Sequence, residues 1–322
     1  MVANLFLHKD AFAYNGTDTE DQVKDKLRSF VDDMRDIVYV HNGENVFYVS
    51  TDFLDCEIFS GISLIESLTE FLDGDRQGIM YSILANTSEQ HNYSMEDLKR
   101  KAQYRPDEEE VNSLVLLNCP TKMKDSSYYI QFDNYEIVYD TSSWITLRRQ
   151  ILGNHPVAPE VFVKECRKYF NNLVFHEACI ESLQDNNYQY LNYIPRKIIF
   201  YLSCLNDCFA LVREEHKTLD PNANSILSDF SGRCGLDEPG SIERNPAKKP
   251  FLTFKFKRTG TYGEEHEVKE MLCEPHLKIS QPDSNCRLDV NDKTFHPRIY
   301  FHFGEETVEN GRILIASIGK HL

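Results

Sequence analysis

The pattern of hydrophobic positions in the first 58 residues predicts a mixed α/β region. Short apolar runs in ANLFLH (3–8) and NVFYVS (45–50) predict strands. Between them, TEDQVKDKLRSFVDDM (within 18–34) places apolar residues at helical spacing after an acidic first turn. That combination predicts an amphipathic helix.

The middle of the chain predicts further strands and then a run of helices. A helical stretch is expected through 59–103, a strand at VNSLVLLN (111–118), and a hairpin at SYYIQFDNYEIVYD (127–140) with its turn at 133–134. From 142 to 217 helices dominate. The segments are SSWITLRRQIL, APEVFVKECRKYF, VFHEACIESLQ and PRKIIFYLSCLNDCFALVREEHKTL.

A change of composition at 219–250 predicts a boundary, because this stretch contains four prolines and three glycines. After it, FLTFKFKR (251–258), RIYFHF (298–303) and RILIASI (312–318) predict strands. The expected fold class is α+β. Its parts are a mixed α/β domain (1–140), a helical region (141–218), a linker (219–250) and a small antiparallel-sheet domain (251–322).

Side-chain alternation predicts two different faces for the C-terminal sheet. In 298–303, Arg298, Tyr300 and His302 point one way, and the intervening apolar residues point the other. In 251–258, Thr253, Lys255 and Lys257 lie opposite an apolar face. The last strand is apolar on both sides, as expected of a central strand. Cationic and imidazole side chains on one face suit the binding of a phosphate.

Charge is distributed unevenly along the 322 residues, whose net charge is −16. Residues 1–244 hold 23 Lys/Arg and 40 Asp/Glu, a net charge of −17, whereas 245–322 hold 12 and 11, a net of +1. The acidity therefore belongs to the N-terminal region, and a nucleic-acid partner is compatible only with the C-terminal module.

Cysteine usage and apolar runs indicate a cytoplasmic protein. The nine cysteines are scattered, and the close pair Cys204 and Cys208 has no second pair at zinc-site spacing. The first residues do not resemble a signal peptide, and no apolar run is long enough to span a bilayer. We therefore expect a reducing compartment, no metal, no cofactor and no membrane partner.

Three segments occur in an informative order: EPHLK (274–278), HPRIYFHF (296–303) and ILIASIGKHL (313–322). They resemble the RelE-like toxins, and most closely the YoeB-type messenger-RNA interferases. In that family an E-P-x-K-type segment precedes an arginine inside a strand. A final apolar strand then ends in a histidine plus one more residue. The resemblance covers about residues 250–322 and implies a RelE-like fold there.

The resemblance implies a role for each matching residue. Glu274 would be the general base, Lys278 and Arg298 phosphate ligands, and His321 the general acid or the stabiliser of the leaving group. The final strand would then hold His321 in place for chemistry. The family also has a helical hairpin between its first strand and the glutamate segment, a place that helices from 157–217 could fill.

These residues suit RNA cleavage without a metal. The 2′-hydroxyl of the substrate attacks the adjacent phosphorus, and a base, a cation and an acid each assist that step. Tyr300, His302, Lys255, Lys257 and Arg258 are candidates for binding the RNA. His276 and His302 are further candidates for the proton donor.

Structural interpretations of the same residues stay open. Arg298 would pair with a glutamate on a solvated face, His321 would belong to a frayed end, and Glu274 would begin a turn. Lys255, Lys257 and Arg258 would form a solvated edge that discourages strand pairing.

The function expected from the resemblance is that of an endoribonuclease toxin that cleaves messenger RNA with help from the ribosome. Its setting would be a toxin–antitoxin or anti-phage defence system, with an antitoxin or defence protein as partner, and the acidic region would regulate it. The alternative is a non-catalytic interaction subunit that keeps the RelE-like fold as a scaffold. A third reading is a metal-dependent nuclease built on N-terminal carboxylates such as Asp10, Asp52 and Asp55.

Overall fold

The computed structural model of the chain forms two compact units, Met1–Arg148 (unit 1) and Arg149–Leu322 (unit 2). The residues it describes are 2–7, 9, 12–40, 46–49, 52–86, 89–90, 110–115, 137–138, 140–154, 157–184, 189–219, 222–260, 267–280 and 296–322. The described part is a mixture of helices and small sheets, the α+β class expected from the sequence.

Unit 1 contains a five-stranded sheet in the order β5-β2-β1-β6-β7, and every described strand pair in it is parallel. The strands are β1 (Val2–Leu7), β2 (Val46–Val49), β5 (Glu89–Gln90), β6 (Glu110–Val115) and β7 (Ile137–Val138). The chain builds outward from β1 on one side and then returns to build on the other. This is the strand order of a doubly wound α/β sheet.

Helices and a small hairpin complete the described part of unit 1. They are α1 (Glu20–Val40), the hairpin β3 (Glu57–Phe59) and β4 (Ile62–Ser63), α2 (Leu64–Glu70) and α3 (Gly74–Asn86). The apolar stripe of α1 is buried, with Val23, Leu27 and Phe30 inaccessible to solvent. The helix predicted at 18–34 is thus confirmed and extends further.

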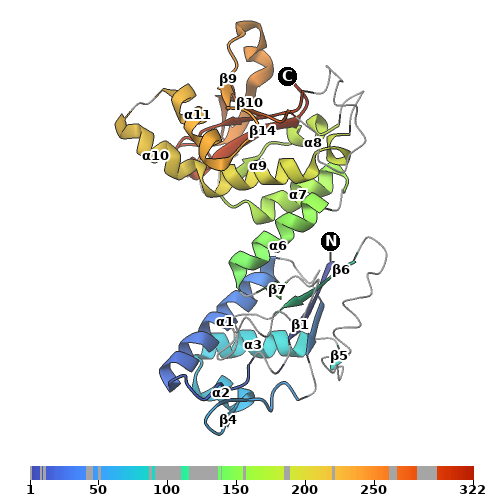
Figure 1. Cartoon of the computed structure of the whole chain (residues 1–322), viewed down its shortest axis with the longest axis vertical. Coiled ribbons are helices and arrows are strands. Elements are labelled where there is room, and N and C mark those ends of the chain that lie inside the picture. Colours follow the sequence, from blue (N-terminus) through green and yellow to red (C-terminus); the bar gives the residue numbers. More distant parts are fainter. Residues whose placement is uncertain are drawn as a thin grey trace. The chain divides into compact units, whose positions relative to one another are not determined.

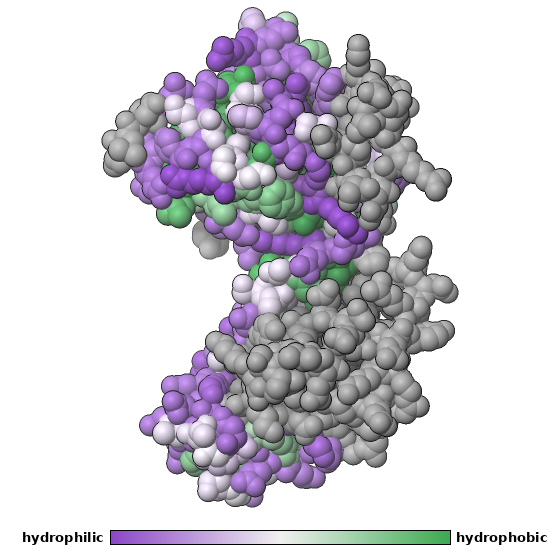
Figure 2. Space-filling model, in the orientation of Figure 1, coloured by the Kyte–Doolittle hydropathy of each residue, from purple (hydrophilic) through white to green (hydrophobic). Residues whose placement is uncertain are grey.

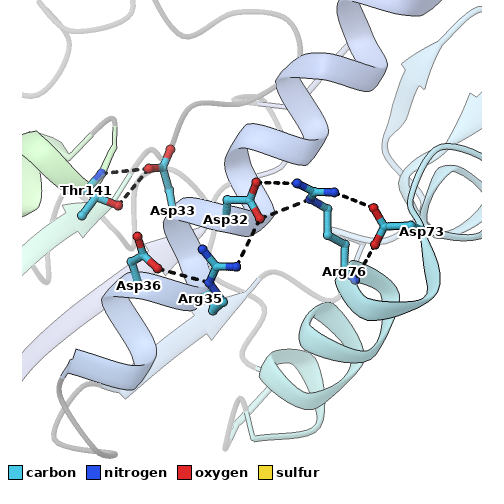
Figure 3. Close-up of polar contacts among 7 residues, drawn as sticks. All are labelled: Asp32, Asp33, Arg35, Asp36, Asp73, Arg76 and Thr141. Carbon is cyan, nitrogen blue, oxygen red and sulfur yellow. Dashed lines mark hydrogen bonds and ion pairs between the residues drawn. The ribbon is translucent and has the colours of Figure 1, made fainter.

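Arg76, near the start of α3, joins that helix to α1 (Figure 3). Its guanidinium donates two hydrogen bonds to the carboxylate of Asp32, at 3.2 and 2.8 Å, and also binds Asp73. A planar guanidinium that grips one carboxylate through two bonds fixes orientation as well as distance. Arg76 therefore holds the start of α3 against the middle of α1.

Asp33, the residue next to Asp32, joins α1 to α6 (Thr141–Asn154), the helix that contains the boundary between the units. Its carboxylate accepts hydrogen bonds from the backbone N–H and the hydroxyl of Thr141, at 3.1 and 2.9 Å (Figure 3). An anion at a helix N-terminus is favoured by the exposed N–H groups and the helix dipole. Burial nevertheless raises the pKa of Asp33, although these two hydrogen bonds lower it.

Unit 2 is built on a second five-stranded sheet, in the order β8-β14-β13-β12-β9. Its strands are β8 (Leu173–Phe175), β9 (Ser241–Ile242), β12 (Pro275–Lys278), β13 (Arg298–His302) and β14 (Ile313–Gly319). All pairs are antiparallel except β8 with β14. Every residue of β14 is buried, which agrees with the central strand predicted for 312–318.

Helices cover one face of this sheet, and α8, α9 and α11 lie close to it in Figure 1. The helices of unit 2 are α7 (Pro159–Tyr169), α8 (Ala178–Ser182), α9 (Pro195–Asp207), α10 (Phe209–Leu219) and α11 (Ala223–Cys234). Phe209 of α10 packs edge-on against Phe301 of β13 and Phe230 of α11. The apolar face predicted for β13 therefore meets the helices.

A separate hairpin covers the opposite face, on which Tyr300 lies. It consists of β10 (Thr253–Lys257) and β11 (Val268–Leu272), preceded by the short helix η3 (Pro246–Leu252). Leu252, Phe256 and Met271 share one buried cluster with Tyr300 and Leu314.

Several predicted boundaries differ from the structure. The segment 174–184 is the end of β8 plus the short α8, and the long helix at 195–219 is broken at Cys208 into α9 and α10. The region 59–103 includes β4 and β5 as well as helices, and its residues 91–103 lie outside the described residues. Most of the hairpin predicted at 127–140 also lies outside them; its described strand β7 pairs in parallel with β6.

Two differences matter for the site. The segment 219–250, expected to be a linker, instead holds α11, with Leu227 and Phe230 fully buried, and the sheet strand β9. The strand within 251–258 is present as β10, but it pairs with β11 and not with β13 or β14. In the main sheet, the edge position beside β14 belongs to β8, and α8 to α11 follow β8 in sequence.

On the face shown in Figure 2, the described surface of unit 2 is largely hydrophilic. Among the described residues, no helix combines the length and apolar character that crossing a bilayer would require.

Candidate functional site

Polar side chains meet where β12, β13 and β14 lie side by side, at the end of the sheet where β13 begins. Lys278 stands directly opposite Arg298, and Arg298 opposite Gly319. In the next row, His276 stands opposite Tyr300, and Tyr300 opposite Ser317. Because directly opposed residues share a face, one side of the sheet carries Lys278, Arg298, His276 and Tyr300 together.

His276 is almost fully buried, with 3% of its surface exposed. Its Nδ1 lies 3.2 Å from the backbone oxygen of Glu274, and its Nε2 lies 3.0 Å from the hydroxyl of Ser241 in β9. Burial lowers the pKa of His276 to about 4, although the hydrogen bond to Glu274 opposes that shift. The imidazole is therefore neutral near pH 7, and its two contacts join the backbone of Glu274 to Ser241 of β9.

The low pKa of His276 predicts that unit 2 loses stability in mild acid. Below about pH 6.5 the unfolded chain binds a proton at this histidine that the folded chain takes up only near pH 4. The cost reaches about 3 kcal/mol at the acidic end of that window. Denaturant unfolding between pH 7 and 4 should thus show a smaller loss for His276→Gln than for the wild type. His296→Gln, which alters an exposed histidine, serves as the control, and equal losses in all three proteins would contradict the prediction.

Tyr300 links Arg298 to the segment that follows β14. The guanidinium of Arg298 approaches the Tyr300 hydroxyl to 3.4 Å, and the backbone of Leu322 hydrogen-bonds to the same oxygen. Burial raises the pKa of Tyr300 to about 12, so the phenol keeps its proton. One buried hydroxyl therefore holds Arg298 and the residue next to His321 at the same point.

The connection from β9 to η3 supplies two consecutive lysines near the start of β12, where Glu274 lies. The N–H of Glu243 donates to the backbone oxygen of Glu274 at 3.0 Å, which extends the pairing of β9 with β12. Asn245 then caps η3 by accepting a hydrogen bond from the N–H of Ala247 at 3.0 Å. The chain turns at this cap and carries Lys248 and Lys249 over the site.

Each of the two lysines contacts one residue that the sequence analysis assigned to catalysis. The ammonium of Lys248 lies 2.7 Å from Nε2 of His321, and that of Lys249 lies 3.3 Å from a carboxylate oxygen of Glu274. Consecutive Cα atoms are about 3.8 Å apart. His321 and Glu274 therefore contact neighbouring residues of the short helix η3.

The segment around His321 is held by backbone contacts as well. The N–H of Lys320 donates to the backbone oxygen of Ser182 at 3.0 Å, and the N–H of Ile318 donates to the hydroxyl of Ser182 at 2.9 Å. Together with the bond between Leu322 and Tyr300, these contacts fix the backbone on both sides of His321.

Four cations and three carboxylates make up the ionic part of the cluster. The ammonium groups of Lys248, Lys249 and Lys278 lie 3.4, 3.3 and 3.7 Å from Glu243, Glu274 and Glu238, respectively. Arg298 has no carboxylate partner among the described residues, and its buried Nε has no hydrogen-bond partner there. In an acidic chain, this cluster carries an excess of positive charge.

The pKa of Glu243 agrees with an excess of positive charge around it. Burial raises the pKa of its carboxyl, but the N–H of Asn245 and the charge of Lys248 outweigh burial, so the pKa lies below its ordinary value. Glu243 is therefore an anion that helps to hold Lys248 in position.

Four residues expected to bind substrate lie away from this cluster. Lys255 and Lys257 are exposed on the outer side of the β10–β11 hairpin, opposite its buried face. Arg258 pairs with Glu267, and its backbone bridges to Val308 near the β13–β14 connection. His302 lies at the other end of β13 from Arg298, where its Nδ1 accepts a hydrogen bond from the N–H of Gly304 and where burial lowers its pKa.

Of the candidates at 298–303, only Arg298 and Tyr300 belong to the cluster, and Tyr300 is fully buried. Sequence reasoning missed Ser241, Glu243, Lys248 and Lys249, all within the expected linker. The only sequence signal for them was the charged pair of lysines in NPAKKP (245–250).

No comparable cluster is described for the N-terminal carboxylates. Asp52, which follows β2, pairs with Lys9, which follows β1. Asp10 lies outside the described residues. Within the described parts of both units, no group of three or more His, Cys, Asp or Glu side chains has the arrangement of a metal site.

The arrangement in unit 2 offers the groups that a phosphodiester reaction uses. Glu274 is a carboxylate that can accept a proton, and His321 is an exposed imidazole. Lys278 and Arg298 are cations on one row of the sheet. Comparison of the chain with protein-family models, with curated proteins and with solved structures finds no match.

Proposed function

We propose that unit 2 is a metal-independent endoribonuclease that cleaves messenger RNA at the cluster of Glu274, Lys278, Arg298 and His321. The observation that carries the proposal is the contact of consecutive lysines, Lys248 and Lys249, with His321 and Glu274. His321 and Glu274, which are 47 positions apart in the sequence, thereby contact consecutive residues of one short helix.

The reaction needs a base for the 2′-hydroxyl, and Glu274 supplies it. The attacking oxygen then places extra negative charge on the phosphorane, which Arg298 and Lys278 offset. A guanidinium, which donates from two nitrogens at once, suits the two non-bridging oxygens of that phosphorane. Each contribution is worth roughly 10²–10⁴-fold in rate.

His321 serves the departing 5′-oxygen. Because the ammonium of Lys248 donates to Nε2, that nitrogen is an acceptor, and the neutral imidazole carries its proton on Nδ1. The Nδ1–H is then the donor for the leaving oxygen, and Lys248 can replace the lost proton through Nε2. Lys248 thus positions His321 and fixes its tautomer.

The order of elements supports the same proposal. The RelE-like toxins have a helical hairpin between their first strand and the glutamate segment; here α8 to α11 lie between β8 and β12 in the sequence, and the strand β11 lies between β10 and β12. The arginine strand and the final strand are antiparallel neighbours, β13 and β14. A toxin–antitoxin or anti-phage setting, a cytoplasmic location and an antitoxin or defence partner rest on that resemblance alone.

RNA sequencing in cells that express the chain tests the proposal. Free RNA is a poor substrate in the family that residues 250–322 resemble, so the test is made in cells, where ribosomes hold the messages. We expect growth arrest and new 5′ ends inside messages. Intact messages during arrest would contradict cleavage and favour the non-catalytic scaffold.

We further propose that unit 1 restrains this activity through its charge. Residues 1–148 hold 13 Lys/Arg and 27 Asp/Glu, a net charge of −14, whereas 149–322 hold 22 and 24, a net of −2. An acidic domain competes with RNA for a cationic site.

Removing unit 1 should therefore increase growth arrest. The cut belongs after Arg148, because a cut at 244 would also remove β8 and the helices that pack on the sheet. The measurement is colony formation after expression of 149–322 or of the whole chain. A fragment that folds, as judged by circular dichroism, but is less toxic than the whole chain would contradict the restraint.

A further inference from the structure

The ammonium of Lys249 is paired with the carboxylate of Glu274, the proposed general base. Its backbone is anchored, because its oxygen accepts a hydrogen bond from the hydroxyl of Thr253 at 2.9 Å. Its side chain is 54% exposed, whereas that of Glu274 is only 23% exposed. The ammonium therefore sits on the solvent side of the carboxylate, where an approaching RNA would meet it first.

The contact between Lys249 and Glu274 is loose. Charge-assisted N–H···O bonds are usually about 2.7–2.9 Å long. Ion pairs elsewhere in unit 2 reach that length, at 2.7 Å for Arg149 with Asp207 and 2.9 Å for Lys168 with Glu165. The distance of 3.3 Å between Lys249 and Glu274 leaves a partner that another anion can displace.

A phosphate is such an anion, and the cluster already favours one. Arg298 lacks a described carboxylate partner, and Lys278 stands directly opposite it on β12. An RNA phosphodiester carries one negative charge, as the Glu274 carboxylate does, so it can compete with Glu274 for the ammonium of Lys249.

We propose that Lys249 exchanges Glu274 for a phosphate next to the scissile bond, so that binding RNA uncovers the base that cleaves it. The exchange rests on the proposed function, because that function assigns Glu274 to removing the proton of the 2′-hydroxyl. It makes Lys249 a substrate-binding residue and keeps Glu274 paired until RNA arrives. Lys248, whose ammonium lies 2.7 Å from Nε2 of His321, stays with that histidine.

Binding of RNA with a 2′-O-methyl group on every nucleotide tests this exchange without cleavage. In the full-length protein, Lys249→Met should weaken binding and reduce the slope of log affinity against log salt by about 0.7, the loss of one phosphate contact on a single strand. Lys249→Arg, which keeps the cation, should restore both. Lys164→Met, on the exposed side of α7, is the control for lost charge.

A double-mutant cycle with Glu274→Gln separates exchange from simple charge effects. Removing the internal partner frees Lys249, so Glu274→Gln should tighten binding by about fivefold in the wild type and not in the Lys249→Met background. Equal tightening in both backgrounds, or unchanged binding by Lys249→Met, would overturn the exchange. Wild-type protein that binds no RNA would overturn the exchange, whereas coupled binding without cleavage of messages in cells would overturn the proposed reaction alone.

Discussion

Replacing Arg298 and His321 together by alanine is expected to abolish cleavage of messenger RNA while the fold survives. Arg298 offsets the charge of the phosphorane, and His321 donates to the leaving oxygen. Each substitution alone should therefore cost roughly 10²–10⁴-fold in rate. Neither side chain belongs to the apolar core, because Arg298 is half-buried and His321 exposed. Cleavage of a reporter message in a translation extract measures the rate.

The matched control is Lys320→Ala, which removes an exposed charge next to His321 and leaves its own backbone contact with Ser182 in place. It should cleave at close to the wild-type rate. A double variant that retains growth arrest and circular dichroism like that of the wild type would favour the scaffold function. A variant that cleaves within tenfold of the wild type would exclude the assigned roles.

Gly319→Ala is expected to destabilise unit 2 strongly. Gly319 has φ +104°, a conformation that side chains rarely adopt, and an added Cβ would lie 2.5 Å from Cδ2 of Tyr190 and 2.8 Å from the backbone oxygen of Ser182. Strain and overpacking together cost about 3 kcal/mol or more. Denaturant unfolding with a fluorescence readout measures the loss.

Gly260→Ala isolates the contribution of the backbone. Gly260 has φ +96°, but a Cβ there meets no atom within 4 Å, so only the conformational cost of about 1–2 kcal/mol remains. Gly319→Ala should also reduce cleavage, because the clash moves the backbone that carries His321. Equal losses of stability in the two variants would contradict the packing described around Ser182 and Tyr190.

Elements with a strong apolar period could be predicted from the sequence. The helix α1 and the strands β1, β2 and β14 follow directly from helical spacing, short apolar runs and an unbroken apolar strand. The faces of β10 were also predicted correctly, since Leu252 and Phe256 are buried and Lys255 and Lys257 are exposed. These features depend on neighbouring residues along the chain.

Features that depend on a distant partner could not be predicted. The strand β8 has only three residues and exists because β14 pairs with it. The partner of β10 is β11 and not the main sheet, a choice that alternation does not determine. The sequence therefore predicts that Lys255, Lys257 and Arg258 lie near Arg298. In the structure they belong to the separate β10–β11 hairpin and the residue that follows β10.

The segment 219–250 shows how composition misled the prediction. Its prolines and glycines indicated a linker, but Ile226, Leu227 and Phe230 recur at helical spacing and are buried in α11. The following residues reach the site only because β9 pairs with β12. Lys248 and Lys249 thus became site residues through tertiary pairing.

The chemistry of the RNA ends tests the proposed site most directly. Attack by the 2′-hydroxyl leaves a 2′,3′-cyclic phosphate on one fragment and a 5′-hydroxyl on the other, whereas a water activated by metal ions leaves ordinary phosphate and hydroxyl ends. Mass spectrometry of messages cleaved by the wild-type protein in a translation extract should find the cyclic phosphate. It should also find no cut at nucleotides that carry a 2′-O-methyl group. Fragments with 5′-phosphate ends, or cuts at methylated nucleotides, would contradict a site in which Glu274, Arg298 and His321 act on one phosphodiester.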